Sequence, residues 1–349
     1  MNNISLKSIK YESIKAIFTS ITEAEKISRA DISEKTELSL VTVGKIADAL
    51  LERDIICQVK EIRTQAGRRA GLLSINESKF ALILDLTSCE FKTAVLDLRL
   101  RLMDKMSYTY RQNLSFEENI GVYLAEVRAT VGRKYDLDNC FGIGVAVPGP
   151  YNEDTDTVSS MRIPCLAKLS VKATIKKYFK NIPVIVDSQI NAAARSNVAN
   201  VPGYEEKNIV YWYISDSFVC GAYIVEGNLI LGKGRHACDF GGTIDESGMT
   251  LENKLDKCTG FDEYLNCLSR AVGNVLKILS PHTLIVEYDS RFACDDILDA
   301  IRQKLTENSH ISEEELPDMM RACCRFRNSH RGLTMHLREM WLENVVFGE

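Results

Sequence analysis

Residues 28–69 read SRADISEKTELSLVTVGKIADALLERDIICQVKEIRTQAGRR, and this stretch decides the fold expected for the N-terminal part of the chain. Ser28 can cap a short helix, with Asp31 as a weak capping-box partner three residues on. After a turn at residues 37–39, Ser39 can cap a second helix. On that helix apolar residues recur at helical spacing and predict a buried stripe of Val43, Ile46, Ala47 and Leu50.

The second helix and the segment after it match a winged helix-turn-helix. A recognition helix presents its N-terminal, outward-facing side chains to the major groove. Residues 55–60 and 72–75 are expected to form two short strands joined by a basic loop. A plain three-helix bundle has the same periodicity, but the turn spacing and the Gly-Arg-Arg loop favour DNA binding. The predicted DNA contacts are Ser39, Thr42 and Lys45 on the helix, and Arg68 and Arg69 in the wing.

The composition is that of an ordinary globular protein. The chain has 349 residues, 45% of them hydrophobic and 26% charged, with a net charge of −5. Residues 1–78 hold 12 Lys and Arg against 11 Asp and Glu, so the acidity lies in the remainder of the chain. No apolar run reaches membrane-spanning length and the first residues do not resemble a signal peptide. We therefore expect a cytoplasmic protein whose eleven scattered cysteines are reduced and mostly buried.

A polar joint at residues 76–79 is the predicted boundary between an N-terminal domain, residues 1–78, and a body, residues 79–349. In the body, strands are followed by strand–helix alternation, and this order occurs twice, which implies two α/β lobes. Residues 227–228 are expected to form a hairpin turn, residues 232–260 a glycine-containing loop region, and residues 313–321 a helix. The apolar face of a last helix, at residues 332–346, could belong to the core or to an interface.

Three segments carry a resemblance to a known family. Residues 145–150 (VAVPGP) resemble its strand and PGP turn, residues 186–194 (VDSQINAAA) its catalytic segment, and residues 67–76 (GRRAGLLSIN) the winged helix of its repressor branch. The chain thus resembles, over nearly its whole length, the ROK family of repressors and sugar kinases. The resemblance implies an actin-like, ribonuclease-H-like α/β body of two lobes with a cleft between them.

The chain departs from the kinases of this family where they bind ATP. Those kinases cradle phosphates on glycine-rich hairpins, because backbone N–H groups approach a phosphate closely only where no side chain intrudes. Residues 85–90 (DLTSCE) and 216–220 (DSFVC) stand where the family has DxGGT and GTGxG, and residues 286–290 (VEYDS) replace a glycine-rich turn near the adenosine. ATP binding in the family's manner is not expected, and no cofactor is predicted.

The catalytic base has also been replaced. Gln189 stands where the family's NDAN motif places an aspartate that takes a proton from a sugar hydroxyl. A glutamine can form a hydrogen bond to a hydroxyl but cannot act as a carboxylate base. We therefore predict that the chain is not an enzyme.

The resemblance also implies a zinc site of one histidine and three cysteines, and the chain departs from that pattern. Gly242 stands at the histidine position, and residues 254–261 (KLDKCTGF) hold no cysteine in register. His236, Cys238 and Cys258 could be argued as a rebuilt site, but no CxxC or HxxxH pair supports one. No metal is predicted.

Positions that hold sugar hydroxyls in the family are partly changed. An arginine at one of them would suit a carboxylate or phosphate, although a solvated or ion-paired arginine is an equally good reading. Asp239 and Glu263 keep a carboxylate at two of these positions. The candidate ligand-binding residues, by resemblance, are Arg162, Gln189, Asp239 and Glu263.

These observations favour a transcriptional regulator, a repressor of carbohydrate-related genes. It would bind a double-stranded, pseudo-palindromic operator as a homodimer or homotetramer, with no membrane partner and with a sugar or acidic metabolite as its small-molecule effector. Two alternatives stay open from sequence: a sugar kinase with an N-terminal appendage, and a scaffold whose winged helix contacts another protein.

Overall fold

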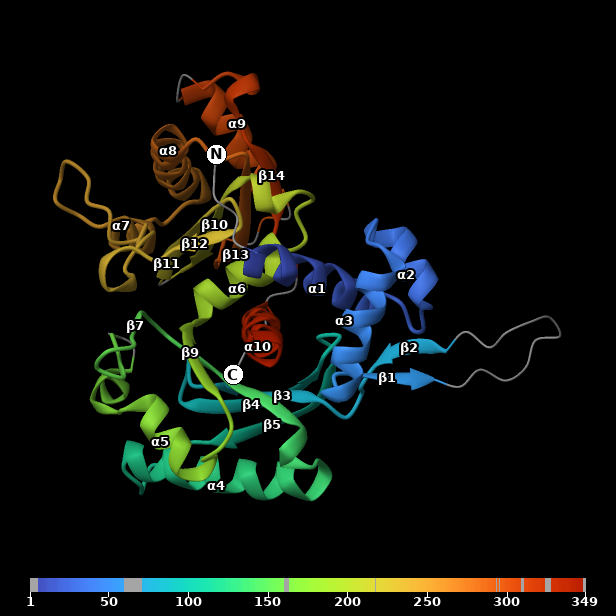
Figure 1. The fold of residues 1–349 in the computed structure, drawn as a ribbon. Helices are drawn as coiled ribbons and strands as arrows, with labels where there is room; N and C mark the ends of the chain where they lie inside the picture. The colour runs from blue at the N-terminus through green and yellow to red at the C-terminus, as the bar shows by residue number, and fades with distance from the viewer. Residues whose placement is uncertain are drawn as a thin grey trace.

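The fold was obtained as a computed structural model that describes residues 6–59, 71–159, 163–216, 218–292, 294, 296–308, 311–323 and 328–347. A small N-terminal domain lies against a body of two lobes, and the C-terminal helix runs between the lobes (Figure 1). We call residues 79–188 together with the C-terminal helix lobe I, and residues 189–323 lobe II. No helix of the described residues has both the length and the apolar character needed to cross a membrane.

The described N-terminal elements occur in the order expected for a winged helix-turn-helix, three helices and then two paired strands; the loop between the strands, residues 60–70, lies outside the described residues. The Ser28 hydroxyl accepts a hydrogen bond from the Asp31 N–H, and the Asp31 carboxylate accepts one from the Ser28 N–H, so the capping box is complete. The predicted stripe on α3 is buried, and β1 pairs with β2 in antiparallel register. The elements are α1 (Leu6–Glu23), α2 (Arg29–Thr36), α3 (Leu40–Glu52), β1 (Ile56–Val59) and β2 (Leu72–Ile75).

Lobe I is a five-stranded sheet in the order β5-β4-β3-β6-β9, with antiparallel pairs at the hairpins and parallel pairs beyond β3. Side chains alternate along β3: Phe80 and Leu82 pack with α4 and α5, whereas Ala81 and Ile83 pack with α10 on the other face. Its main elements are β3 (Phe80–Asp85), β4 (Glu90–Asp97), β5 (Leu102–Thr109), α4 (Phe116–Lys134), β6 (Cys140–Val147), β7 (Tyr151–Asn152), β8 (Thr157–Val158), α5 (Val171–Tyr178), β9 (Val184–Ser188) and α10 (Asn328–Phe347).

Lobe II repeats this topology in the order β12-β11-β10-β13-β14, so the expectation of two equivalent α/β lobes is confirmed. Trp212 of β10 packs toward α8 and α9, and Tyr211 packs toward α6 on the opposite face. The main elements are α6 (Gln189–Val198), η3 (Tyr204–Glu206), β10 (Asn208–Ser215), β11 (Phe218–Val225), β12 (Asn228–Ile230), η4 (Lys233–Arg235), α7 (Leu251–Lys257), α8 (Phe261–Leu279), β13 (Thr283–Asp289), α9 (Ile297–Asn308) and β14 (Asp318–Arg321).

Several local expectations were wrong. Residues 313–321 are not a helix: a short 3-10 turn precedes β14, whose residues complete the sheet edge by pairing with β13. The hairpin turn lies one residue earlier than expected, because Glu226 and Gly227 are its central residues, both with positive φ. The loop region at 232–260 contains α7. Of the ten described cysteines, four are exposed and three are buried, so they are not mostly buried.

The C-terminal helix α10 is part of the core. Leu333, Leu337 and Leu342 are buried in one hydrophobic cluster with residues of α1 and of the lobe I sheet, while Trp341 stacks on Phe141 at 5.2 Å. The open choice between core and interface is therefore decided in favour of the core for these residues. Gly332 brings the backbone of α10 against α6, since a Cβ at this position would lie 1.7 Å from the Ala192 carbonyl oxygen.

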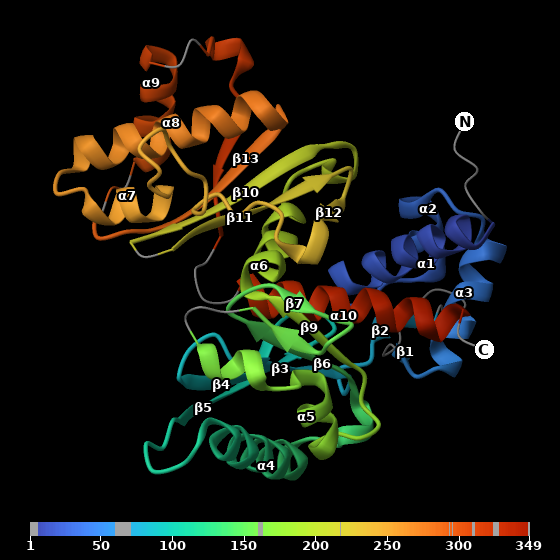
Figure 2. The same cartoon turned by 90° about the vertical axis from the view of Figure 1, so that its left-hand side faces the viewer.

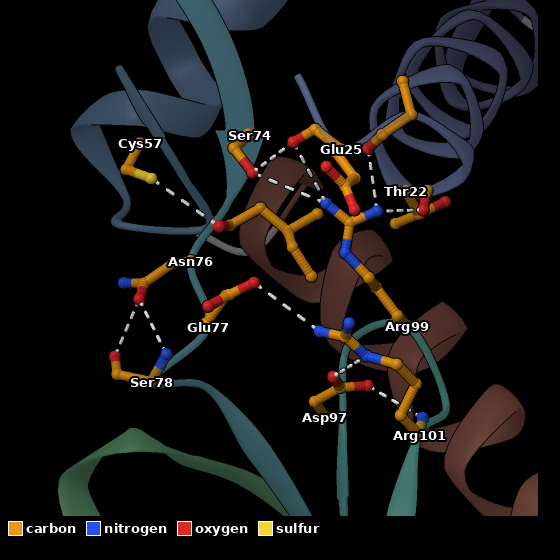
Figure 3. A network of polar contacts seen from close by, with 12 residues as sticks. Thr22, Glu25, Cys57, Ser74, Asn76, Glu77, Ser78, Asp97, Arg99 and Arg101 are labelled. Carbon is orange, nitrogen blue, oxygen red and sulfur yellow. Dashed lines mark hydrogen bonds and ion pairs between the residues drawn. The ribbon is translucent and has the colours of Figure 1, made fainter. Parts of the chain in front are cut away.

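Arginines of the body hold the end of α1. Arg99, in the turn between β4 and β5, donates hydrogen bonds to the carbonyls of Thr22, Ala24 (2.8 Å) and Glu25 (3.4 Å), as Figure 3 shows. The last carbonyls of a helix have no partner within the helix, so a cation placed there stabilises its end. Arg338 of α10 lies over the Phe18 ring, 5.5 Å from its centroid. The N-terminal domain and the body are therefore linked by these side-chain contacts as well as by the chain at residues 76–79.

Candidate functional site

The first candidate site is the outward face of α3. Ser39 caps the helix by accepting a hydrogen bond from the Thr42 N–H at 3.1 Å, and the two hydroxyls lie 2.9 Å apart. Ser39 and Lys45 are exposed and Thr42 is partly exposed, so the three predicted contacts lie together on the N-terminal half of the helix. Lys45 makes no ion pair with another described residue.

Leu40 and Val41 belong to the same surface; the sequence places Leu40 on this outer face with Thr42 and Lys45, whereas Val41 was not predicted to lie there. Their exposed fractions are 58% and 67%, high for large apolar side chains in a folded domain. An apolar side chain at the start of a recognition helix can contact a thymine methyl group. The signal was present in the sequence, because both residues fall off the buried stripe. Arg68 and Arg69, predicted for the wing, lie outside the described residues.

The second candidate site is a cavity of about 360 Å³ where the PGP turn of lobe I faces lobe II. Gln189 lies here at the first position of α6, because β9 ends at Ser188 and the Ser188 hydroxyl caps the helix. Asp239 reaches the same cavity from the loop after η4. Polar atoms on both walls and a volume of this size are typical of small-molecule sites, and we call this cavity the cleft.

The structure brings together only part of the predicted ligand set. Gln189 and Asp239 line the cavity, whereas Glu263 is exposed at the start of α8 and accepts a hydrogen bond from the Thr259 N–H. Glu263 does not line the cavity, so the structure does not support this residue as a ligand contact. Arg162 lies outside the described residues.

Other lining residues were not predicted from sequence as ligand contacts. Arg235 and His236 follow β12 in an irregular loop, and Glu252 lies on α7, where its carboxylate accepts a hydrogen bond from the Val219 N–H at 2.8 Å. Since the sequence places these residues in a stretch without regular periodicity, only the folded loop reveals that they share a cavity with Gln189.

A neighbouring cavity of about 190 Å³ has an acidic lining. It includes Asp85, Glu287 and Asp289, and it shares Gln189 with the cleft. Burial alone would raise the pKa of Asp85, but hydrogen bonds from His330 and Thr87 outweigh burial and lower it, so this carboxyl is ionised at neutral pH. Lys92 lines the same cavity, so its lining carries three carboxyl groups and one amine.

Behind the cleft lies a buried carboxylate. Burial raises the pKa of Asp187, while a 3.0 Å hydrogen bond from the Asn191 amide and the Arg195 guanidinium act against that rise. Burial, together with Arg195 and Arg235, lowers the pKa of His336 to about 4, so this imidazole is neutral at neutral pH. Among the residues that the structure describes, no three His, Cys, Asp or Glu side chains are grouped to hold a metal ion.

No protein-family model matches the chain. A putative xylose repressor of a Caldicellulosiruptor species is 23% identical over 87% of this chain and 75% of its own length. The xylose repressor of Bacillus subtilis is 23% identical over 69% of this chain, which spans 62% of that relative's length.

Solved structures share the fold. A ROK family transcriptional regulator, a homologue of the E. coli MLC protein, superposes with a TM-score of 0.73 at 16% identity, covering 97% of this chain and 98% of its own. A ROK family glucokinase from Streptomyces griseus, in complex with glucose and AMPPNP, superposes with a TM-score of 0.57 at 15% identity over 74% of this chain.

The structure defines a class: a winged helix-turn-helix joined to an actin-like, two-lobed body. Within that class the chain is similar in sequence to xylose repressors, and it shares the fold of a ROK family transcriptional regulator.

Proposed function

We propose that this chain is a sequence-specific DNA-binding transcriptional regulator, a repressor of carbohydrate-related genes. Residues 1–78 form the DNA-binding domain and residues 79–349 the effector body. The observation that carries the proposal is the exposed N-terminal face of α3, with Ser39, Thr42 and Lys45 presented in the manner of a recognition helix. The relatives named above are a putative xylose repressor and a xylose repressor, which agrees with this function.

The extent of the superpositions supports the same division of roles. The regulator covers 97% of this chain, whereas the glucokinase covers 74% of it although 98% of the glucokinase is matched. A body equivalent to a whole kinase, preceded by an additional domain, accounts for both values. The operator would be pseudo-palindromic and bound by a dimer, since two-fold protein symmetry matches a two-fold site.

Binding of random DNA duplexes by the purified full chain, at about physiological salt, tests the proposal. We expect an inverted repeat to be enriched. Changing Lys45 to Ala should weaken binding to that repeat and reduce the salt slope by about 1, because one phosphate contact is lost. Lys180→Ala, at an exposed lysine of lobe I, is the matched control and should leave both values unchanged. Enrichment of no sequence would contradict the proposal and favour the protein-binding scaffold.

The body acts in this proposal as a sensor, with the cleft as the effector site. A ligand releases DNA only when it binds one arrangement of the domains better than the other. Lys15, in the middle of α1, interacts electrostatically with Tyr204 and Glu205 of lobe II, while Arg99 of lobe I holds the C-terminal end of α1. Since α1 interacts with both lobes, a change in the angle between the lobes would reach the winged helix.

Sugar phosphorylation is not expected. Gln189 offers no carboxylate base, and residues 85–90 and 216–220 lack the glycines on which the family's kinases cradle phosphates. A coupled assay with ATP and a panel of hexoses should show no turnover above background. Gln189→Asp should also show none, because the added base does not restore the missing glycines. Turnover by the unmodified chain would establish the kinase alternative.

A further inference from the structure

The loop that closes one side of the cleft has an unusual backbone. Arg235 and Cys238 have φ values of 61° and 62°, and both side chains line the cleft. Residues other than glycine rarely adopt this left-handed conformation, which costs free energy of folding, and such positions cluster at ligand sites. The flanking glycines, Gly232 and Gly234, adopt positive φ without that cost. The folded loop thus holds Arg235 at the cavity.

Arg235 forms an ion pair that crosses from one lobe to the other. Its guanidinium lies 3.2 Å from the carboxylate of Glu153, in the turn after β7 of lobe I. Figure 2 shows β7 at the level where the two lobes meet. Glu153 has a second partner in its own lobe, since Lys172 lies 3.5 Å away. Glu153 would therefore keep a cation if Arg235 turned toward a ligand.

Arg235 is the one lysine or arginine among the described residues that line the cleft. Asp239 and Glu252 line the same cleft, and Asp85, Glu287, Asp289 and Lys92 line the neighbouring cavity. The field of Arg235 extends inward, because it contributes to the lowered pKa of His336. An anionic group on a ligand would be attracted to the Arg235 guanidinium and repelled by the carboxylates.

Resting on the proposed function, we propose that Arg235 is a specificity residue of the effector site and that the effector is an anionic sugar derivative, a polyol bearing a carboxylate or a phosphate. The Arg235 guanidinium leaves Glu153 and donates two paired hydrogen bonds to the oxyanion of the ligand, while Gln189 and Asn191 face the ligand's hydroxyl groups. Since the Arg235–Glu153 pair joins the lobes, this exchange of partners alters their contact at the cleft.

The test measures binding to the full chain by titration calorimetry and thermal shift. The probes are glucose, glucuronate, glucose 6-phosphate, xylose and xylonate, each up to about 10 mM. Comparison of the glucuronate, xylonate and glucose 6-phosphate arms distinguishes a carboxylate from a phosphate. We expect at least one anion to bind roughly tenfold or more tightly than its neutral parent, the factor a charge-assisted hydrogen bond to arginine provides.

Two variants locate the effect. Arg235→Gln should remove the preference for the anion, with the backbone strain unchanged because glutamine also has a Cβ. Glu153→Gln should increase affinity for the anion, because the competing carboxylate is gone. Arg111→Gln is the matched control, since it removes an exposed arginine that pairs with Glu126 at 2.8 Å outside the cleft.

Three outcomes would overturn the inference: no anion binds, neutral sugars bind as tightly as the anions, or Arg235→Gln keeps the anion preference. Selection of DNA duplexes by the same protein is an independent readout. A chain that enriches an operator but shows no anion preference would refute this inference alone, whereas failure to enrich any DNA would refute the proposed function.

Discussion

Gly332→Ala is expected to lower the free energy of unfolding by about 3 kcal/mol, the upper range for overpacking a closed core. The added Cβ would lie 1.7 Å from the Ala192 carbonyl oxygen and 2.6 Å from its carbonyl carbon. These are backbone atoms of α6, so no side-chain rotation can relieve the clash. Helices α6 and α10 would have to separate, and α6 begins at Gln189 in the cleft. Urea unfolding of the full chain measures the loss.

The matched control is another helical glycine. Gly44, on α3, has no atom within 4 Å of an added Cβ, so Gly44→Ala should stabilise the protein by about 0.5–1 kcal/mol through helix propensity alone. If the free energy of unfolding falls in Gly332→Ala and rises in Gly44→Ala, then packing around the added methyl group, and not the loss of a glycine as such, sets the effect. A Gly332→Ala protein as stable as the parent would show that α6 and α10 are not held in close contact.

Arg99→Ala should free the end of α1 and lower the stability of the winged helix by about 2 kcal/mol, since hydrogen bonds from a charged donor are lost and the carbonyls they satisfied remain. The Arg99 guanidinium donates hydrogen bonds to the carbonyls of Thr22, Ala24 and Glu25. It also lies 3.4 Å from the Ser74 hydroxyl (Figure 3). Hydrogen exchange should quicken in α1 while amides of β6 keep their protection.

Arg111→Ala is the control for this prediction. Its ion pair with Glu126 is about half exposed on both sides, so its loss should change stability by less than about 1 kcal/mol. If exchange in α1 were the same in Arg99→Ala and in the parent, the bridge between α1 and the β4–β5 turn would contribute nothing, and the contact of α1 with lobe I would rest on apolar packing alone.

Sequence reasoning succeeded where structure is encoded locally. Ser28, Ser39 and the buried stripe of α3 lie within a few residues of their partners, and caps and helical periodicity are read over that distance. The doubled strand order of the body was also readable, because each buried strand forms a continuous apolar run. Gln189 was located by its neighbours in a recognisable segment, and the structure places it in the cleft.

Sequence reasoning failed where the deciding partner lies far along the chain. Residues 318–321 form a strand because the edge of β13 is available for pairing, which local propensity at residues 313–321 does not report. Glu263 matched a motif, but the loop before α8 leaves it exposed and outside the cavity.

The sequence by itself determined a helix-turn-helix, two α/β lobes and the loss of the kinase's glycines and base, because each depends on residue types within a short segment. Only the tertiary structure decided that Arg235 faces Glu153 across the cleft, that α10 is core, and that Arg99 holds the end of α1. The Arg235 and Arg99 contacts join residues about 80 positions apart, and such pairs are fixed by how the lobes and the N-terminal domain pack.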